Sequence, residues 1–182
     1  AECLIPMIDK NEDYAIKLAT DLIENFKNIY EDKWLNMMRG KLGLFGKEKK
    51  DEKLITDLLN WMEKNKADYT NTFCHLMDID TGDVIYQKND FINWAKEWKI
   101  RSNLNNSYRE KGIELMKKNN PIIIPRNHIV EDALKKAESG DLDKVNKLLQ
   151  VLKEPFDKQK KIKEYQKPSP MGNKKYQTFC GT

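Results

Sequence analysis

Apolar side chains recur at intervals of three and four residues along most of the chain, which is the spacing of amphipathic helices. The longest such stretch runs from residue 9 to about residue 45; Asn11 is placed to cap its start, and Gly43 and Gly46 to mark its end. A charged linker at residues 47–53 follows it. Shorter stretches with helical spacing lie at residues 54–62, 68–77, 91–98 and 108–116. We therefore predict a mainly α protein that folds as an irregular helical bundle.

A helical hairpin is predicted at residues 125–156, where two short amphipathic stretches are separated by a turn. Asn127 would cap the first arm, Gly140 would end it, and Asp141 would cap the second arm. No similar unit recurs upstream, so we expect a single hairpin rather than an array of repeats. The side chains expected to face inward are Val130, Ala133, Leu134, Ala137, Val145, Leu148, Leu149 and Leu152.

The domain organisation follows from two changes in this pattern. Residues 78–90 are rich in Asp, Asn and Gly and form the clearest break, which we predict to be a loop. Residues 1–156 are expected to form one helical region around this loop. Residues 157–182 are expected to form a basic, proline-containing tail with an extended end that carries Cys180.

Composition narrows the class of protein. The chain has 182 residues, 39% hydrophobic and 34% charged, with a net charge of +4. We expect a soluble protein that binds neither nucleic acid, because its charges nearly balance, nor a membrane, because no long uncharged apolar run is present. The three cysteines are few and widely spaced, which favours a reducing compartment such as the cytoplasm. Residues 1–6 resemble neither a signal peptide nor a natural start, so we expect a piece of a longer chain.

No complete catalytic motif is found. The stretch from Gly40 to Lys47 resembles a phosphate-binding loop. However, five residues separate Gly40 from Gly46, whereas four residues separate the two glycines of a Walker motif. The glycine-rich loop, catalytic loop and metal-binding motif of protein kinases are also absent. His75 and His128 are the only histidines, and neither forms a convincing pair with a cysteine. We predict no catalytic or cofactor-binding residue in this chain.

Two further groups of residues have a simpler structural interpretation. Asp78, Asp80 and Asp83 resemble the start of a calcium-binding loop, but Gly82 comes one position too early, so we expect a plain acidic loop and no metal site. Tryptophans at helical spacing are interpreted as core residues, with a partner-binding surface as the alternative. These tryptophans are Trp34, Trp61, Trp94 and Trp98.

Cys180 lies three residues from the end of the sequence, where a thiol is exposed by its position. On position alone it is either a redox-active residue or an unreactive terminal thiol.

A set of short motifs also stands out in order along the chain. They read MRGKLGL at residues 38–44, KADYT at 66–70 with TF at 72–73, NP at 120–121, PRNH at 125–128, E at 131 with AL at 133–134, GD at 140–141, PF at 155–156 and YQTFCGT at 176–182. Together they resemble the C-terminal third of the selenoprotein O family, YdiU-like proteins with a pseudokinase fold.

The resemblance implies a protein adenylyltransferase, which transfers AMP from ATP to Ser, Thr or Tyr hydroxyls of other proteins with the help of Mg²⁺ or Mn²⁺. The ligands of ATP and the metal would lie in a kinase-like part upstream of this chain, so no catalytic residue carries over. The implied partners are that upstream kinase-like domain and the protein substrates. The implied location is the cytoplasm for a bacterial-type member and the mitochondrion for a eukaryotic one.

The resemblance implies a functional role for one residue of this chain. The family's reactive chalcogen, selenocysteine in some members and cysteine in others, is third from the C-terminus and matches Cys180. It is implied to pair with a cysteine of the kinase-like core. This chain ends in Gly181-Thr182 where some members have Ser-Ser.

The competing hypothesis is an independent helical module that binds partner proteins through residues 125–156.

Overall fold

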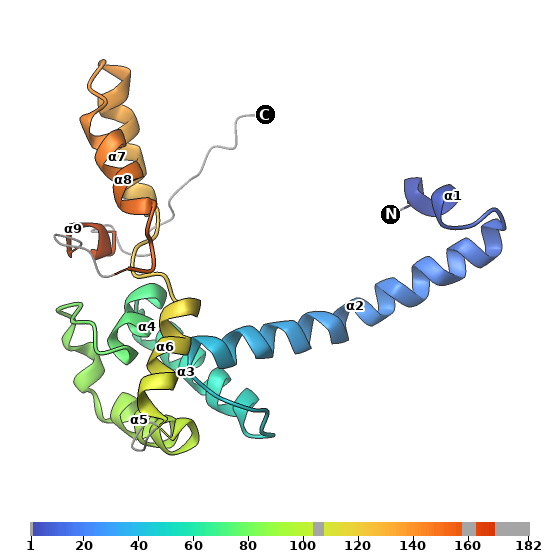
Figure 1. Cartoon of the computed structure of the whole chain (residues 1–182), viewed down its shortest axis with the longest axis horizontal. Coiled ribbons are helices and arrows are strands. Elements are labelled where there is room, and N and C mark those ends of the chain that lie inside the picture. The colour runs from blue at the N-terminus through green and yellow to red at the C-terminus, as the bar shows by residue number, and fades with distance from the viewer. Residues whose placement is uncertain (1, 104–107, 158–162, 170–182) are drawn as a thin grey trace. The chain divides into compact units, whose positions relative to one another are not determined.

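The computed structural model describes residues 2–103, 108–157 and 163–169 (Figure 1). Most of these residues are helical, and none of them forms a strand. The mainly α fold predicted from the sequence is therefore confirmed. Within the same ranges, no helix combines the length and the apolar character needed to cross a membrane.

The chain divides into two compact units, Ala1–Arg39 and Gly40–Thr182. The first unit contains η1 (Glu2–Leu4), α1 (Ile5–Ile8) and most of the 30-residue helix α2 (Glu12–Lys41). The side-chain oxygen of Asn11 accepts a hydrogen bond from the Tyr14 N–H at 3.1 Å, and two acidic residues follow in the first turn. Asn11 therefore caps α2 as predicted, because it satisfies one of the free N–H groups at the helix start.

The second unit is built from the remaining helices. They are α3 (Asp51–Asn65), α4 (Tyr69–Leu76), η2 (Val84–Gln87), α5 (Asn89–Ser102), α6 (Arg109–Asn119), α7 (Asn127–Glu138), α8 (Asp143–Leu152) and α9 (Lys163–Gln166). Residues 78–90, predicted to be a loop, contain η2 and the start of α5, and Tyr86 of η2 is buried. The predicted boundary between a helical region and a tail at residue 156 remains a prediction.

The core of the second unit forms where α3 packs against α5. Trp94 and Trp98 of α5 are buried and stack nearly parallel, with ring centroids 6.0 Å apart. Their indole N–H groups donate to the carbonyl oxygens of Leu54 and Leu42, each at 2.9 Å, so neither buried polar group lacks a partner. Trp61 is buried as well. The interpretation as core residues is confirmed for Trp61, Trp94 and Trp98, whereas Trp34 of α2 is only half-buried.

A buried ion pair joins the start of α3 to the end of α5. Asp51 has no exposed surface, and its carboxylate accepts from Arg101 Nε at 2.6 Å and from Arg101 Nη2 at 3.2 Å. The same carboxylate accepts from the Glu48 N–H at 3.0 Å. The segment that the sequence suggests is a charged linker therefore contributes a residue to the interior.

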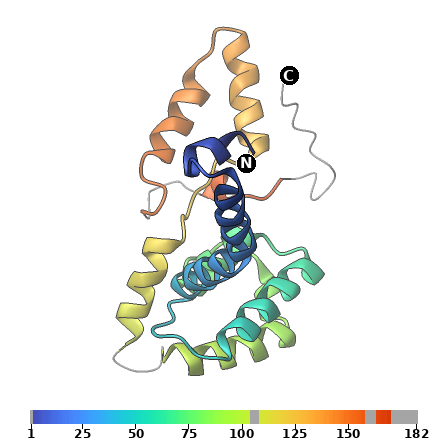
Figure 2. The same ribbon diagram turned by 90° about the vertical axis from the view of Figure 1, so that its right-hand side faces the viewer.

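Helices α7 and α8 lie side by side and antiparallel, as Figure 2 shows, and form a hairpin. Ala133 and Leu148 are buried, whereas Leu134 and Leu149 are 54% and 55% exposed. The prediction that Leu134 and Leu149 face inward is therefore wrong. Leu134 and Leu149 lie about 100° around their helices from Ala133 and Leu148, outside the narrow stripe that each helix of the hairpin buries.

The end of α7 follows the prediction, but the predicted N-caps of both arms are wrong: the N-cap of α8 is Leu142 and not Asp141, which lies one residue before it. Gly140 ends α7 with a positive φ of 86°, and the Asp141 side chain accepts from the Asp143 N–H at 3.1 Å. The N-cap of α7, however, is Arg126 and not Asn127, which already lies in the helix. Arg126 has an extended backbone, and its side chain is held elsewhere, as described below.

Candidate functional site

The residue that the sequence singles out, Cys180, lies outside the described residues. The two cysteines inside them differ in character: Cys3 is exposed and Cys74 is fully buried in α4. Burial, with a smaller contribution from the nearby Asp68 carboxylate, raises the pKa of the Cys74 thiol to about 11. Because the thiolate is the reactive form, Cys74 is not suited to thiol exchange at neutral pH.

The three acidic residues of the predicted acidic loop bind different partners. Asp80 accepts from the Gly82 N–H and from Lys163, and Asp83 accepts from the Ile85 N–H at the start of η2. Asp78 pairs with Arg109 of α6 at 2.8 Å. Within the described ranges, no group of three or more His, Cys, Asp or Glu residues is placed to hold a metal ion.

The glycine-rich stretch that begins at Gly40, in the last turn of α2, is a packing corner. A Cβ atom on Gly40 would lie 2.9 Å from the Asn119 side chain, and one on Gly43 would lie 2.8 Å from the Gly112 carbonyl oxygen. Lys41 points into this corner, where it donates to Asn119 O at 3.1 Å and to Asn120 Oδ1 at 3.2 Å. Its ammonium group is therefore bound to the protein and does not present a phosphate-binding cradle.

A polar cluster joins the starts of α4 and α7 to α9. We call it the Arg126 clamp and define it by Arg126, Asp68 and Asn71. Arg126 Nη1 and Nη2 donate to the two oxygens of Asp68 at 2.6 and 2.9 Å, and Nη2 also donates to Asn71 Oδ1 at 3.2 Å. The Arg126 and Asp68 side chains are only 9% and 17% exposed. A two-point arginine–carboxylate pair of this kind fixes both position and orientation.

Asp68 has two roles in this cluster, as a helix cap and as the counter-charge of Arg126. It is the N-cap of α4, where its side chain accepts from the Asn71 N–H at 2.8 Å. Burial alone would raise the pKa of Asp68, but the hydrogen bonds from Arg126 and from the Asn71 N–H outweigh this effect and hold the pKa below its ordinary value. Asp68 is therefore ionised at neutral pH and supplies the counter-charge that Arg126 needs.

The clamp also binds the segment that leads into the C-terminal tail. Arg126 Nε donates to Tyr165 O at 3.2 Å, and Asn71 Nδ2 donates to Gln166 O at 3.0 Å. The Gln166 side chain is buried, and its Nε2 donates to Ile122 O at 3.4 Å. We call residues 163–169 the clamped segment, because its backbone is held by side chains from two other helices.

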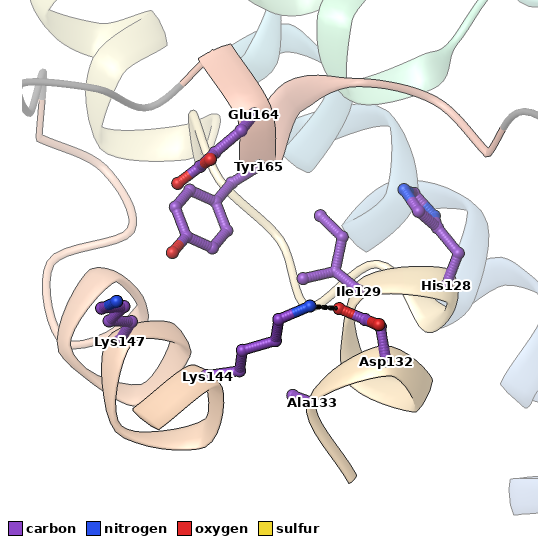
Figure 3. Close-up of a pocket in the computed structure, with 8 residues that line it drawn as sticks. All are labelled: His128, Ile129, Asp132, Ala133, Lys144, Lys147, Glu164 and Tyr165. Atoms are coloured by element: carbon purple, nitrogen blue, oxygen red, sulfur yellow. Dashed lines mark hydrogen bonds and ion pairs between the residues drawn. The ribbon is translucent and has the colours of Figure 1, made fainter. Parts of the chain in front are cut away.

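A cavity of about 420 Å³ lies between the clamped segment and the α7–α8 hairpin (Figure 3). Figure 3 shows the Tyr165 ring on one side of it and Lys144 paired with Asp132 on the other. Lys147 and Glu164 also line it, so its charges balance. The balance gives the cavity no preference for an anion or a cation.

The described residues thus define a helical protein segment whose polar side chains mainly join helices to one another. The family model described as "Protein adenylyltransferase SelO" matches residues 2–153. The chain therefore belongs to the SelO family.

Curated relatives match the chain over its whole length. A "Protein nucleotidyltransferase YdiU" of Pelagibacter ubique is 50% identical over 184 residues, which cover 100% of this chain and 38% of that protein. Proteins with the same name from Clostridium perfringens and Nitrosococcus oceani are each 42% identical and are covered to 37%. The chain spans less than two-fifths of the length of the relatives it matches.

Sequence reasoning found the motif residues of the clamp but missed their role. Asp68 and Arg126 are both in motifs that carry the family resemblance, yet 58 residues separate them along the chain. The only local signal was Asp68 at an N-cap position, with Asn71 three residues later. Gln166, whose burial holds the clamped segment in place, gave no signal in the sequence.

Proposed function

We propose that the chain is the C-terminal helical part of a protein adenylyltransferase, which transfers AMP from ATP to hydroxyl groups of proteins. In this proposal ATP and Mg²⁺ or Mn²⁺ are bound by the kinase-like part of the longer protein. The chain studied here contributes no catalytic residue and binds no cofactor. Its roles are to support the kinase-like part and to supply Cys180 as a redox-active thiol, in the cytoplasm of a bacterial cell.

Two findings support the proposed activity. The family model and the 50% identical relative carry the names of an adenylyltransferase and a nucleotidyltransferase. Because this chain covers 38% of that relative, the remaining 62% is available to hold the catalytic machinery.

The proposal that this chain supports the kinase-like part rests on the exposed apolar face of α2 in the first unit. Leu22, Phe26 and Tyr30 repeat every four residues on one side of the helix and are 64%, 64% and 57% exposed. Ile23 and Ile29 beside them are also exposed. A continuous apolar strip of this length is a mark of an interaction surface. The partner we assign to it is the kinase-like part of the same protein, since most of the family's chain length lies outside these residues.

Re-association of separately expressed parts tests this assignment. The 182-residue chain and the rest of the same protein should co-purify when they are co-expressed, and Phe26→Asp should weaken their binding at least tenfold. A phenylalanine that becomes buried contributes about 2 kcal/mol, and about 1.4 kcal/mol corresponds to a factor of ten in affinity. Leu149→Asp on the α7–α8 hairpin is the matched control, because it also places a charge on an exposed apolar position.

The exposed leucines of the hairpin favour a second candidate function. Leu134, Leu142 and Leu149 are each more than half exposed, which would suit an independent module that binds partner proteins. The same experiment separates the two candidates. If the two parts fail to associate, the independent hairpin module is favoured. If only Leu149→Asp weakens their binding, the assignment of the contact surface to α2 is wrong and the hairpin is that surface.

A further inference from the structure

A histidine belongs to the aromatic cluster that joins α4, η2 and α5. The His75 ring of α4 stacks on the Tyr86 ring of η2, with centroids 4.1 Å apart and planes inclined by 13°. It also meets the Phe91 ring of α5 at a steep angle, with centroids 5.7 Å apart. His75 is half-buried, and no hydrogen bond to its ring nitrogens is found in the described part of the chain. Contacts between rings therefore hold the imidazole in place.

Tyr86 attaches η2 to the helices around it. Among the four residues of η2 it is the buried one, with 4% of its surface exposed, whereas Val84 is 71% exposed. The Tyr86 hydroxyl group lies 3.3 Å from Thr72 Oγ1 of α4, and His75 covers one face of the Tyr86 ring. The attachment of η2 therefore depends mainly on whether His75 stays on this ring.

The charge of His75 is set by burial and by four charged groups. Those groups are the exposed carboxylates of Asp78, Asp80 and Asp83 in the acidic loop, and the ammonium group of Lys99 on α5. Burial lowers the pKa of His75 below its ordinary value of 6.5, although the carboxylates favour the protonated ring. Burial also raises the pKa of Tyr86 to about 12, so the tyrosine stays neutral. Within the stack, His75 is therefore the group that changes charge in the range of about pH 5 to 8.

We propose that His75 is a pH-operated latch for η2: the neutral ring covers Tyr86, and the protonated ring leaves Tyr86 for the carboxylates of the acidic loop, so that η2 opens more often. A charged ring is disfavoured where it is half-buried against apolar surface and favoured beside solvated carboxylates. The proton comes from the solvent, and no covalent bond of the chain changes. The latch lies within the second unit and needs neither Cys180 nor a kinase-like part, so its failure would leave the proposed function untouched.

The direction of the pH effect follows from the lowered pKa of the closed form. Above pH 6.5, His75 is neutral whether η2 is closed or open, and the latch contributes fully. As the pH falls from 6.5 through the lower pKa of the closed form, the open form binds more protons and the closed form loses stability. Each unit between the two pKa values multiplies the ratio of open to closed molecules by about ten.

Two measurements on the full 182-residue chain test the latch. NMR titration of the imidazole protons gives the pKa of His75, and the assignment is simple because His128 is the only other histidine. The Lys88 N–H donates to Ile85 O at 3.3 Å at the end of η2, and its hydrogen exchange, corrected for the intrinsic rate, gives the opening equilibrium. The measured pKa should lie below 6.5, and opening at acidic pH should increase by the factor that this pKa requires.

Three variants separate the latch from other effects of pH. His75→Phe keeps an aromatic ring on Tyr86 but removes the titrating group, so the opening of η2 should no longer depend on pH between about 5 and 8. Tyr86→Ala uncovers the imidazole and should move the pKa of His75 towards its ordinary value. His128→Phe is the matched control, because it removes the other histidine, on α7, and should keep the pH dependence of the parent chain. Circular dichroism checks that each variant keeps its helix content.

Three results would each overturn the inference. One is a His75 pKa at or above 6.5 in the parent chain, because attraction between the imidazolium and the Tyr86 ring would then hold the charged form on the stack. Another is an opening equilibrium of the Lys88 amide that does not change with pH. The third is a pH dependence that survives in His75→Phe, since another group would then be responsible for it.

Discussion

At the scale of single residues, two buried aspartate–arginine pairs decide much of the structure. Asp51 pairs with Arg101 and Asp68 pairs with Arg126, in both cases through two hydrogen bonds. Sequence reasoning places acidic residues on the surface by default, because burying an unpaired charge is very costly. A buried aspartate therefore requires a positively charged partner. The arginine partners of Asp51 and Asp68 lie 50 or more residues away along the chain.

The Asp68 pair should make stability depend on pH in a defined direction. The folded-state pKa of Asp68 is lowered, so its contribution is complete above the ordinary value of 3.8 and is lost as the pH falls through the lower folded-state pKa. Asp68→Asn should therefore cost about 3 kcal/mol at neutral pH, because it leaves Arg126 buried without a counter-charge, and the cost should shrink in acid. Urea unfolding at several pH values measures this.

Asp78→Asn provides the comparison for that experiment. Its partner is also an arginine, Arg109, but both side chains are more than half exposed, so the loss should stay within about 1 kcal/mol. If Asp68→Asn cost no more than Asp78→Asn, the buried pair would not have the role assigned to it.

At the scale of elements, the sequence predicted where most helices lie but not which of their faces are covered. The cap of α2 by Asn11 and the end of α7 at Gly140 follow from local chemistry and are confirmed. The orientation of Leu134 and Leu149 was predicted wrongly, because periodicity shows that a helix has an apolar face and does not show what covers it. Gly43 shows both cases. The turn that it forms depends on local sequence, whereas its tight contact with α6 depends on the tertiary structure.

Gly43 should tolerate no side chain. Its φ is +67°, and a Cβ atom would lie 2.8 Å from the Gly112 carbonyl oxygen, which belongs to helix backbone and cannot move aside. Gly43→Ala should lower the free energy of unfolding by about 3 kcal/mol or more, the sum of backbone strain of about 1–2 kcal/mol and the steric overlap.

Gly82→Ala separates the two contributions to that loss. Gly82 has a similar φ of +74° but nothing within 4 Å of its would-be Cβ, so only the backbone strain should remain. Chemical denaturation of both variants gives the difference directly, and equal losses would show that the contact with Gly112 is unimportant.

At the scale of the whole molecule, the chain corresponds to less than two-fifths of the length of its family relatives. It matches relatives along its full length but covers only 37–38% of theirs. In the proposed function, the apolar strip on α2 and the Cys180 thiol both act on the kinase-like part. Within the described residues the two buried aspartate–arginine pairs join helices to one another.

Replacement of the terminal thiol tests the redox role at this scale. In the intact protein, an oxidant should change the rate of AMP transfer by joining Cys180 to an upstream cysteine, and Cys180→Ser should abolish that response while leaving the rate under reducing conditions unchanged. The rate of AMP incorporation into a protein substrate, with and without oxidised glutathione, measures this. Cys3→Ser is the control, and a response that survives in Cys180→Ser would remove the proposed role.

The sequence by itself determined the helical fold class, the caps and stops of several helices, and the family, because all three are written in local spacing and in short motifs. Only the tertiary structure showed that Asp68, Asn71, Arg126 and Gln166 meet, and that Gly43 lies against Gly112. Such contacts join residues far apart in the chain, and their energies depend on burial and on a partner's geometry. Neither quantity can be obtained from the spacing of residue types alone.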